Sequence, residues 1–194
     1  MKTLRSFFLL VSLTVPFHVH LAQEHAASEE IRDVSPDKKF GVGILFNAKP
    51  ENAKKPDLIS ITDVDLVSLP SKAKVMEIPT NERVPHLVWS SDSNWFAFPL
   101  YEPRTSDTHI YHRTGDNFAE FETNRLAVDV AGDVRTERVT PIRWLKPGLL
   151  LLKDEVMFRD GADATVRFTA RFDEKTGETK IISKKKRAPG SKED

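Results

Sequence analysis

The chain has 194 residues, 39% of them hydrophobic, and its 29 basic residues balance its 29 acidic ones. This balance argues against nucleic-acid binding, which usually needs a concentrated basic face. The absence of cysteine excludes disulfides, thiolate metal ligands, cysteine nucleophiles and lipid attachment through a cysteine.

The N-terminal residues 1–22 have the pattern of a secretory signal peptide. Two cations precede an apolar run over 6–17, and a polar stretch then ends at Ala22. We expect cleavage after Ala22, or at a later position up to Ala27. The alternative is a retained anchor, but the apolar run is short for a bilayer. We therefore expect a periplasmic or secreted protein without a membrane span, whose remaining 172 residues suffice for one domain.

Strand signals dominate the mature chain, and no segment has a convincing helical stripe. A polar linker is expected over 23–33, and a basic, disordered tail over 184–194. Lys184–Arg187 could grip an anionic lipid or polysaccharide weakly, although terminal charge runs commonly serve solubility. Between these ends we expect strands at 31–34, 40–47, 58–67 and 73–78, then at 84–89, 95–101, 107–113 and 118–123, and finally at 139–144, 149–159, 164–172 and 178–183.

Side-chain patterns predict how deeply some of these strands are buried. Trp95–Phe98 and Leu149–Leu152 are apolar at every position, so both faces of each strand should be covered. Residues 164–172 instead alternate between apolar and polar, which predicts a sheet with one wet face. The last four strands should therefore form an end unit that nothing further covers.

A short phrase recurs at a fixed interval along the chain. Val34, Trp89 and Trp144 are each followed by a turn-like segment, and they are 55 residues apart. Asp37 and Asp92 occupy the same place in the first two turns. A constant period of this size is typical of repeat architectures. We expect one repeat domain over 34–183, with repeats at about 34–80, 81–123 and 137–183.

The residues that carry this phrase resemble TolB-type, WD40-like β-propeller repeats. That family has an aromatic residue, then Ser-Pro-Asp-Gly-Lys, then an apolar strand ending in Ala-Phe. The copy at Trp89–Phe98 matches well. The copy at Val34–Phe40 lacks the aromatic residue and the glycine, and the third keeps only Trp144 and a Pro-Gly turn. The resemblance implies an all-β fold of three tandem four-stranded antiparallel sheets.

Three units are fewer than the four to eight blades of a closed propeller. The sheets could stack as an open partial ring, a fourth sheet could form from other segments, or subunits could complete one another as a homo-oligomer. A small antiparallel β protein with convergent turns is the remaining alternative. In all of these interpretations Trp89 and Trp144 are expected to be core residues.

Candidate sites for chemistry are few. The Gly-x-Ser-x-Gly nucleophile motif is absent. His109 and His112 should face opposite sides of one strand, which makes them a poor metal pair. Asp63 and Asp65 should share a face about 6 to 9 Å apart. Together with Trp95 they are the candidate ligand-binding residues, and we predict no catalytic residue, cofactor or metal.

The sequence therefore favours an exported, non-enzymatic binding module whose partner is a protein or an envelope polymer. Recognition is expected in the loops 48–57, 102–107 and 124–137, because loops commonly carry function. The alternative is an extracytoplasmic enzyme that acts on glycans through Asp63 and Asp65 or through the Asp154–Glu155 pair.

Overall fold

The computed structural model describes residues 28–46, 61–81, 83–123 and 126–187. The predicted signal peptide 1–22, the loop 48–57 and the last residues 188–194 lie outside these ranges. Every regular element in the described part of the chain is a β-strand, so the all-β prediction is confirmed. No helix there could cross a membrane.

The first four strands form one antiparallel sheet in the order β1-β2-β3-β4, which we call unit 1. Its strands are β1 (Ser28–Arg32), β2 (Phe40–Phe46), β3 (Ile61–Ser68) and β4 (Lys74–Glu77). Most of β1 falls within the segment expected to be a linker. The linker prediction is therefore wrong for Ser28–Arg32, because this segment pairs along its whole length with β2.

The other eight strands form one continuous sheet. Unit 2 comprises β5 (Val88–Trp89), β6 (Trp95–Tyr101), β7 (Thr105–Thr114) and β8 (Asn117–Glu120). Unit 3 comprises β9 (Val134–Lys146), β10 (Leu149–Phe158), β11 (Asp163–Asp173) and β12 (Glu178–Arg187). Since β12 runs to Arg187 and pairs with β11, the predicted disordered tail does not begin at Lys184.

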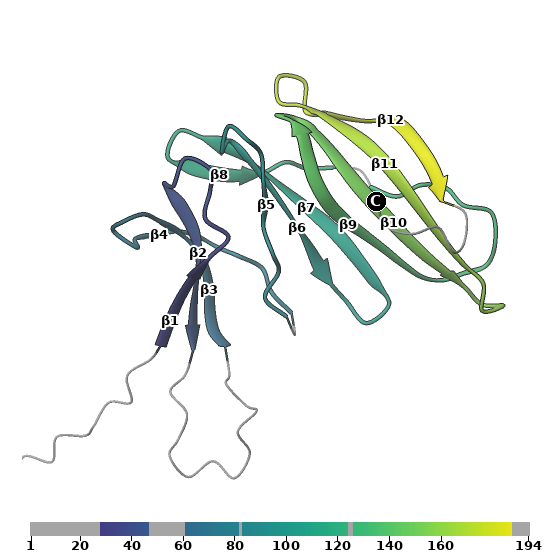
Figure 1. Cartoon of the computed structure of the whole chain (residues 1–194), viewed down its shortest axis with the longest axis horizontal. Helices are drawn as coiled ribbons and strands as arrows, with labels where there is room; N and C mark the ends of the chain where they lie inside the picture. The colour runs from purple at the N-terminus through teal and green to yellow at the C-terminus, as the bar shows by residue number, and fades with distance from the viewer. Residues whose placement is uncertain (1–27, 47–60, 82, 124–125, 188–194) are drawn as a thin grey trace, which may run out of the picture.

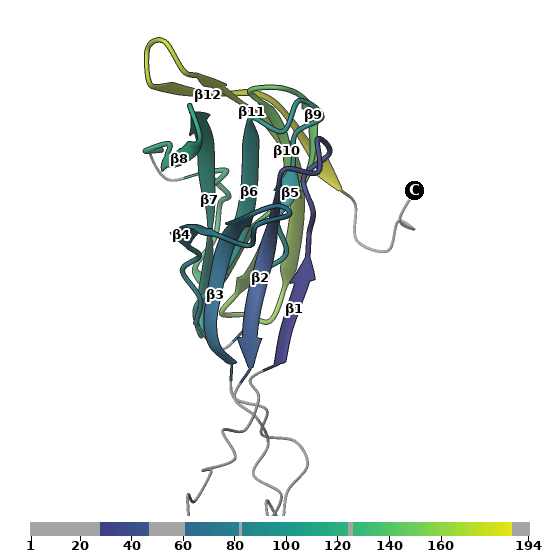
Figure 2. The same ribbon diagram turned by 90° about the vertical axis from the view of Figure 1, so that its left-hand side faces the viewer.

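Units 2 and 3 are joined where three separate sheets were expected. β9 pairs in parallel with β7 through Thr105↔Glu137 and Ser106↔Arg138. β9 can pair with the N-terminal end of β7 because the short β8 pairs only with the C-terminal end of β7. The two sheets have four and eight strands, and neither closes on itself. Figure 1 shows unit 2 between the other two units, and Figure 2 shows that the axes of β2, β3, β6 and β7 are roughly aligned.

Two hydrophobic clusters hold the units together, one on each face of unit 2. Phe96 and Phe98 of β6 belong to the cluster shared with unit 1. Trp95 and Ala97 of the same strand belong to the cluster shared with unit 3. The prediction that Trp95–Phe98 is covered on both faces is thus confirmed.

The leucine run of β10 is covered on one face only. Leu150 and Leu152 are fully buried, whereas Leu149 and Leu151 are half-buried on the opposite face. The prediction of burial on both faces is wrong, because no further unit in the described part of the chain packs against unit 3. Val166, Phe168 and Ala170 of β11 are buried on the same inner face, as the alternation over 164–172 predicts.

Candidate functional site

The turns that open units 1 and 2 have the same hydrogen-bond pattern. The Ser35 hydroxyl donates to the Asp37 carboxylate over 2.6 Å. In the second copy the Ser90 hydroxyl donates to Asp92 over 2.5 Å. Each serine oxygen also accepts from a backbone amide five residues later, at 3.0 and 2.9 Å. Lys38 and Ser93 both adopt a φ of 59°, at the place where the resembled family has glycine.

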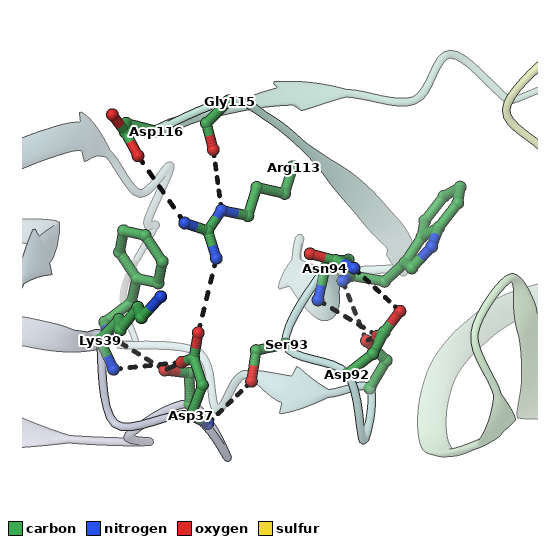
Figure 3. A network of polar contacts seen from close by, with 12 residues as sticks. Asp37, Lys39, Asp92, Ser93, Asn94, Arg113, Gly115 and Asp116 are labelled. Atoms are coloured by element: carbon green, nitrogen blue, oxygen red, sulfur yellow. Dashed lines mark hydrogen bonds and ion pairs between the residues drawn. The ribbon is translucent and has the colours of Figure 1, made fainter.

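The two turns contact each other across the boundary between units 1 and 2. The Asp37 amide donates to the Ser93 hydroxyl oxygen over 2.9 Å. The Arg113 guanidinium lies 3.5 Å from the Asp37 carboxylate and 4.8 Å from the centre of the Phe40 ring. Figure 3 shows Arg113 between Asp37 and Asp116. This network binds one unit to the next, so we assign it a structural role. At its edge Asp92 and Asn94 also line an open groove of about 500 Å³ beside unit 3.

The pKa values of both turn carboxylates are lowered. Burial opposes this shift at Asp37, but the Ser35 hydroxyl, the Lys39 amide, Ser93 and the charge of Arg113 outweigh it. At Asp92 burial is likewise outweighed by hydrogen bonds from Ser90 and from the amide and side chain of Asn94. Both aspartates therefore hold their turns in the ionised form.

The tryptophans of the repeat make equivalent bonds to the preceding unit. The Trp89 indole N–H donates to the Asp33 carbonyl over 2.6 Å, and the Trp144 indole donates to the Val88 carbonyl over 2.9 Å. Each donor lies 56 residues after its acceptor. Val34 stands at the equivalent place in unit 1, where no unit precedes it within the described residues, and it is 45% exposed.

The candidate ligand residues are not brought together. Asp63 and Asp65 lie on the outer face of β3, and the Lys74 ammonium lies 2.8 Å from Asp65. Trp95 is only 4% exposed, and its ring is 4.2 Å from His112 and 5.6 Å from Trp144. The three residues therefore form no common site.

The Asp154–Glu155 pair is also divided between two faces. Asp154 is fully buried and accepts from the Val128 amide over 3.0 Å. Glu155 is exposed on the outer face, 3.0 Å from Lys153. The segment around Val128 was expected to be a recognition loop, but Leu126 and Val128 are buried in the core between units 2 and 3. Leu126 and Val128 are two positions apart in the sequence, and this spacing is the signal that indicates their burial.

The two histidines of β7 pair with separate glutamates. His109 lies 2.7 Å from Glu120, and His112 lies 2.8 Å from Glu174. His109 and Glu120 line an open groove of about 750 Å³. Beside them, burial and the charge of Glu120 raise the pKa of Tyr111 to about 12. No group of three or more histidines and carboxylates within the described ranges could hold a metal ion.

One strongly charged surface was not identified by the sequence patterns. It is the outer face of unit 3, opposite the buried Leu150 and Leu152. Cross-strand partners in an antiparallel pair share a face, so the register from Leu149 to Glu155 places four rows of side chains there. We call this surface the basic face. Its cations are Arg138, Arg143, Lys146, Lys153, Arg167, Arg171, Lys180 and Lys185.

Few carboxylates balance these cations. Glu155 is the one acidic side chain described in the four rows, and it pairs with Lys153. At the end of the face Glu178 lies 2.8 Å from Lys180, and Asp173 is opposite Glu178 on the neighbouring strand. Asp92, Asp173 and Glu174 line an open groove together with Lys146 and Arg171. Among the described residues the other six cations form no ion pair. The chain is neutral overall, so this face represents a separation of charge rather than a general basicity.

Comparison with known proteins gives no family. No protein-family profile matches the chain, and no curated protein matches it. Among solved structures, a puromycin-hydrolyzing peptidase from Mycobacterium tuberculosis resembles it weakly, with a TM-score of 0.36 and 10% sequence identity. The match covers 78% of this chain, which spans about a third, 31%, of the length of that peptidase.

Proposed function

We propose that the protein is an exported, non-enzymatic binding module of the cell envelope, periplasmic or secreted. Its three units form an open stack of propeller-like sheets, similar to TolB-type repeats. The matching serine–aspartate turns of units 1 and 2 support this relation between the units. The Trp89 and Trp144 indoles each donate to a carbonyl 56 residues earlier, and this equivalence relates unit 3 to unit 2 as well.

The observation that carries the proposal is the basic face at the end of the stack, which no described segment covers. Its cations project from four paired strands, so the backbone fixes the spacing of their Cα atoms. Cations at a regular spacing suit a multivalent anion, because one extended ligand can contact several of them at once. Of the carboxylates considered for catalysis, Asp154 and Glu155 lie on opposite faces of β10. Asp63 and Asp65 share the outer face of β3, but Asp65 pairs with Lys74.

The test is capture of a partner from an envelope extract. The mature chain would be immobilised through its N-terminus, which leaves β12 free, and bound material would be analysed by mass spectrometry and sugar analysis. We expect one abundant protein or polymer that is released by salt, since exposed charge interactions are screened.

A charge-matched control makes this test specific. A chain with Arg143→Gln, Arg167→Gln and Arg171→Gln should lose the captured material. A chain with Lys39→Gln, Arg83→Gln and Arg104→Gln, three exposed cations elsewhere, should keep it. Failure to capture any material would contradict the proposal, and turnover of a glycan by the native chain would then favour the enzymatic alternative.

A further inference from the structure

The dimensions of the basic face follow from the spacing of its strands and of the side chains along them. Neighbouring strands lie about 4.8 Å apart, and successive side chains on one face of a strand are separated by about 7 Å. Four strands and the rows from Leu149 to Glu155 therefore form a surface about 15 Å by 20 Å. Six of its eight cations are exposed, and Lys153 and Arg167 are half-buried.

Like charges are placed directly opposite one another on this face. Lys153 faces Arg167, and Arg167 faces Lys185 on the next strand. Arg171 also faces Lys180. Directly opposed like charges destabilise a sheet, so these pairs do not contribute to the stability of the fold. A bound polyanion would turn this repulsion into attraction.

We infer that the basic face binds a linear acidic polysaccharide, an inference that rests on the proposed function. Carboxylates spaced along an extended chain can contact cations in successive rows. Arg143, Arg167 and Arg171 can each donate two parallel hydrogen bonds to one carboxylate. Leu149 and Leu151 lie half-buried among them and offer apolar contact to sugar rings.

The face suits other occupants less well. The described side chains in its rows include no aromatic ring on which a nucleic-acid base could stack. Leu149 and Leu151 are half-buried and expose little apolar surface to a lipid layer. Ile142, Leu145 and Ile182 are exposed at the bulges of the same sheet, so lipid vesicles belong in the test. A second copy could offer the outer face of unit 1, but its Glu29, Asp65 and Glu77 already pair with lysines. Asp63 is exposed on that face without a described ion pair, and one carboxylate does not neutralise six unpaired cations.

The test is titration of the full mature chain with polygalacturonate. Fully methyl-esterified polygalacturonate of the same length is the matched ligand, because it keeps the backbone and loses the charge. We expect binding of the acid form that weakens as salt is raised, and at least about tenfold weaker binding of the ester form.

The variants used for envelope capture locate the site. The chain with Arg143→Gln, Arg167→Gln and Arg171→Gln should bind polygalacturonate about tenfold or more weakly. The chain with Lys39→Gln, Arg83→Gln and Arg104→Gln should bind like the native protein. Without polymer, the first variant should melt at the native temperature or above it, because like-charge repulsion is removed. This result would exclude misfolding as the cause of lost binding.

Several results would overturn the inference. They are equal binding of the ester and acid forms, equal loss in the two variants, or binding only to duplex DNA or to phosphatidylglycerol vesicles in parallel titrations. Self-association that is abolished by the basic-face variant would assign the face to a second copy. If the native chain captures envelope material but does not bind polygalacturonate, the polysaccharide inference fails and the proposed function stands. If it captures nothing, the proposed function itself fails.

Discussion

At the scale of single residues, equivalent hydrogen bonds show the repeat more clearly than residue identities do. Trp89 and Trp144 each use an indole N–H to satisfy a carbonyl of the unit before. Val34 stands at the same interval, but its short aliphatic side chain has no N–H to donate and is 45% exposed.

We expect Trp89→Phe and Trp144→Phe to destabilise the fold by similar amounts. Each leaves one part-buried carbonyl without its donor, at a cost of about 1–3 kcal/mol. Urea unfolding followed by circular dichroism measures this cost. Trp95→Phe is the control, because no indole bond is described for Trp95. A large effect at one repeat position and none at the other would contradict the equivalence of the two bonds.

The turn aspartates should make stability depend on pH in the acid range. Their pKa values in the folded protein lie below the ordinary value of 3.8, so the folded state favours the ionised carboxylates. Their contribution is complete above that value and is lost as pH falls through the lowered pKa values. Stability should therefore decrease as pH is taken below about 4.

Asp37→Asn and Asp92→Asn test this dependence. Each variant should be less stable than the native protein at neutral pH, and the two should converge as the pH falls, because the lost carboxylate no longer contributes there. Denaturant midpoints at a series of pH values measure this convergence. A constant difference between variant and native protein at every pH would assign the effect to shape rather than to charge.

At the scale of elements, β10 shows how one strand can divide its leucines between two environments. Leu152 is completely buried, whereas Leu151 is half-buried beside Arg143 and Thr169 on the basic face. Leu152→Ala should cost about 2–5 kcal/mol, because a buried cavity remains. Leu151→Ala should cost about 1 kcal/mol or less. Thermal unfolding of the two variants decides between one-sided and two-sided burial, and equal losses would contradict the one-sided description.

The central strand β6 should tolerate charge on neither face. Phe96 is fully buried between units 1 and 2, so Phe96→Asp places a carboxylate in that core without a described partner. We expect this variant to be unfolded in circular dichroism spectra. Phe96→Leu is the control and should fold with a lower melting temperature. A folded Phe96→Asp protein would show that this core is not as closed as described.

At the scale of the whole molecule, the units should depend on one another. A fragment ending at residue 123 would lose the cover over Trp95 and Ala97, which are at most 4% exposed in the full chain. We expect it to aggregate or to bind a hydrophobic dye. A chain ending at Arg187 keeps all the described strands and should behave like the native protein. A soluble fragment with native-like cooperative unfolding would show that unit 3 is independent.

The local features of this fold could be predicted from the sequence. Strand character, the 55-residue interval and the one-sided burial of 164–172 each depend on residues close together in the chain. Alternation with period two needs no knowledge of distant partners. The same holds for the serine–aspartate turns, whose bonds close within five residues.

The faces of paired strands could not be predicted in this way. Bulges interrupt β9 and β12, and each one shifts the alternation by one residue. For this reason Arg138 and Arg143 share a face although they are five positions apart. Lys180 and Lys185 do so as well, whereas strict alternation would separate them. A sequence pattern that assumes strict alternation assigns these cations to opposite faces of the sheet. It therefore does not predict the basic face.

The sequence by itself thus determined that this chain folds into tandem β meanders, because side-chain alternation and turn chemistry are local. Only the tertiary structure decided that β7 and β9 join two of the units, that Lys184–Arg187 belongs to a strand, and that eight cations share one open face. These features depend on pairing between distant segments and on the exact register of each bulge, which no local pattern records.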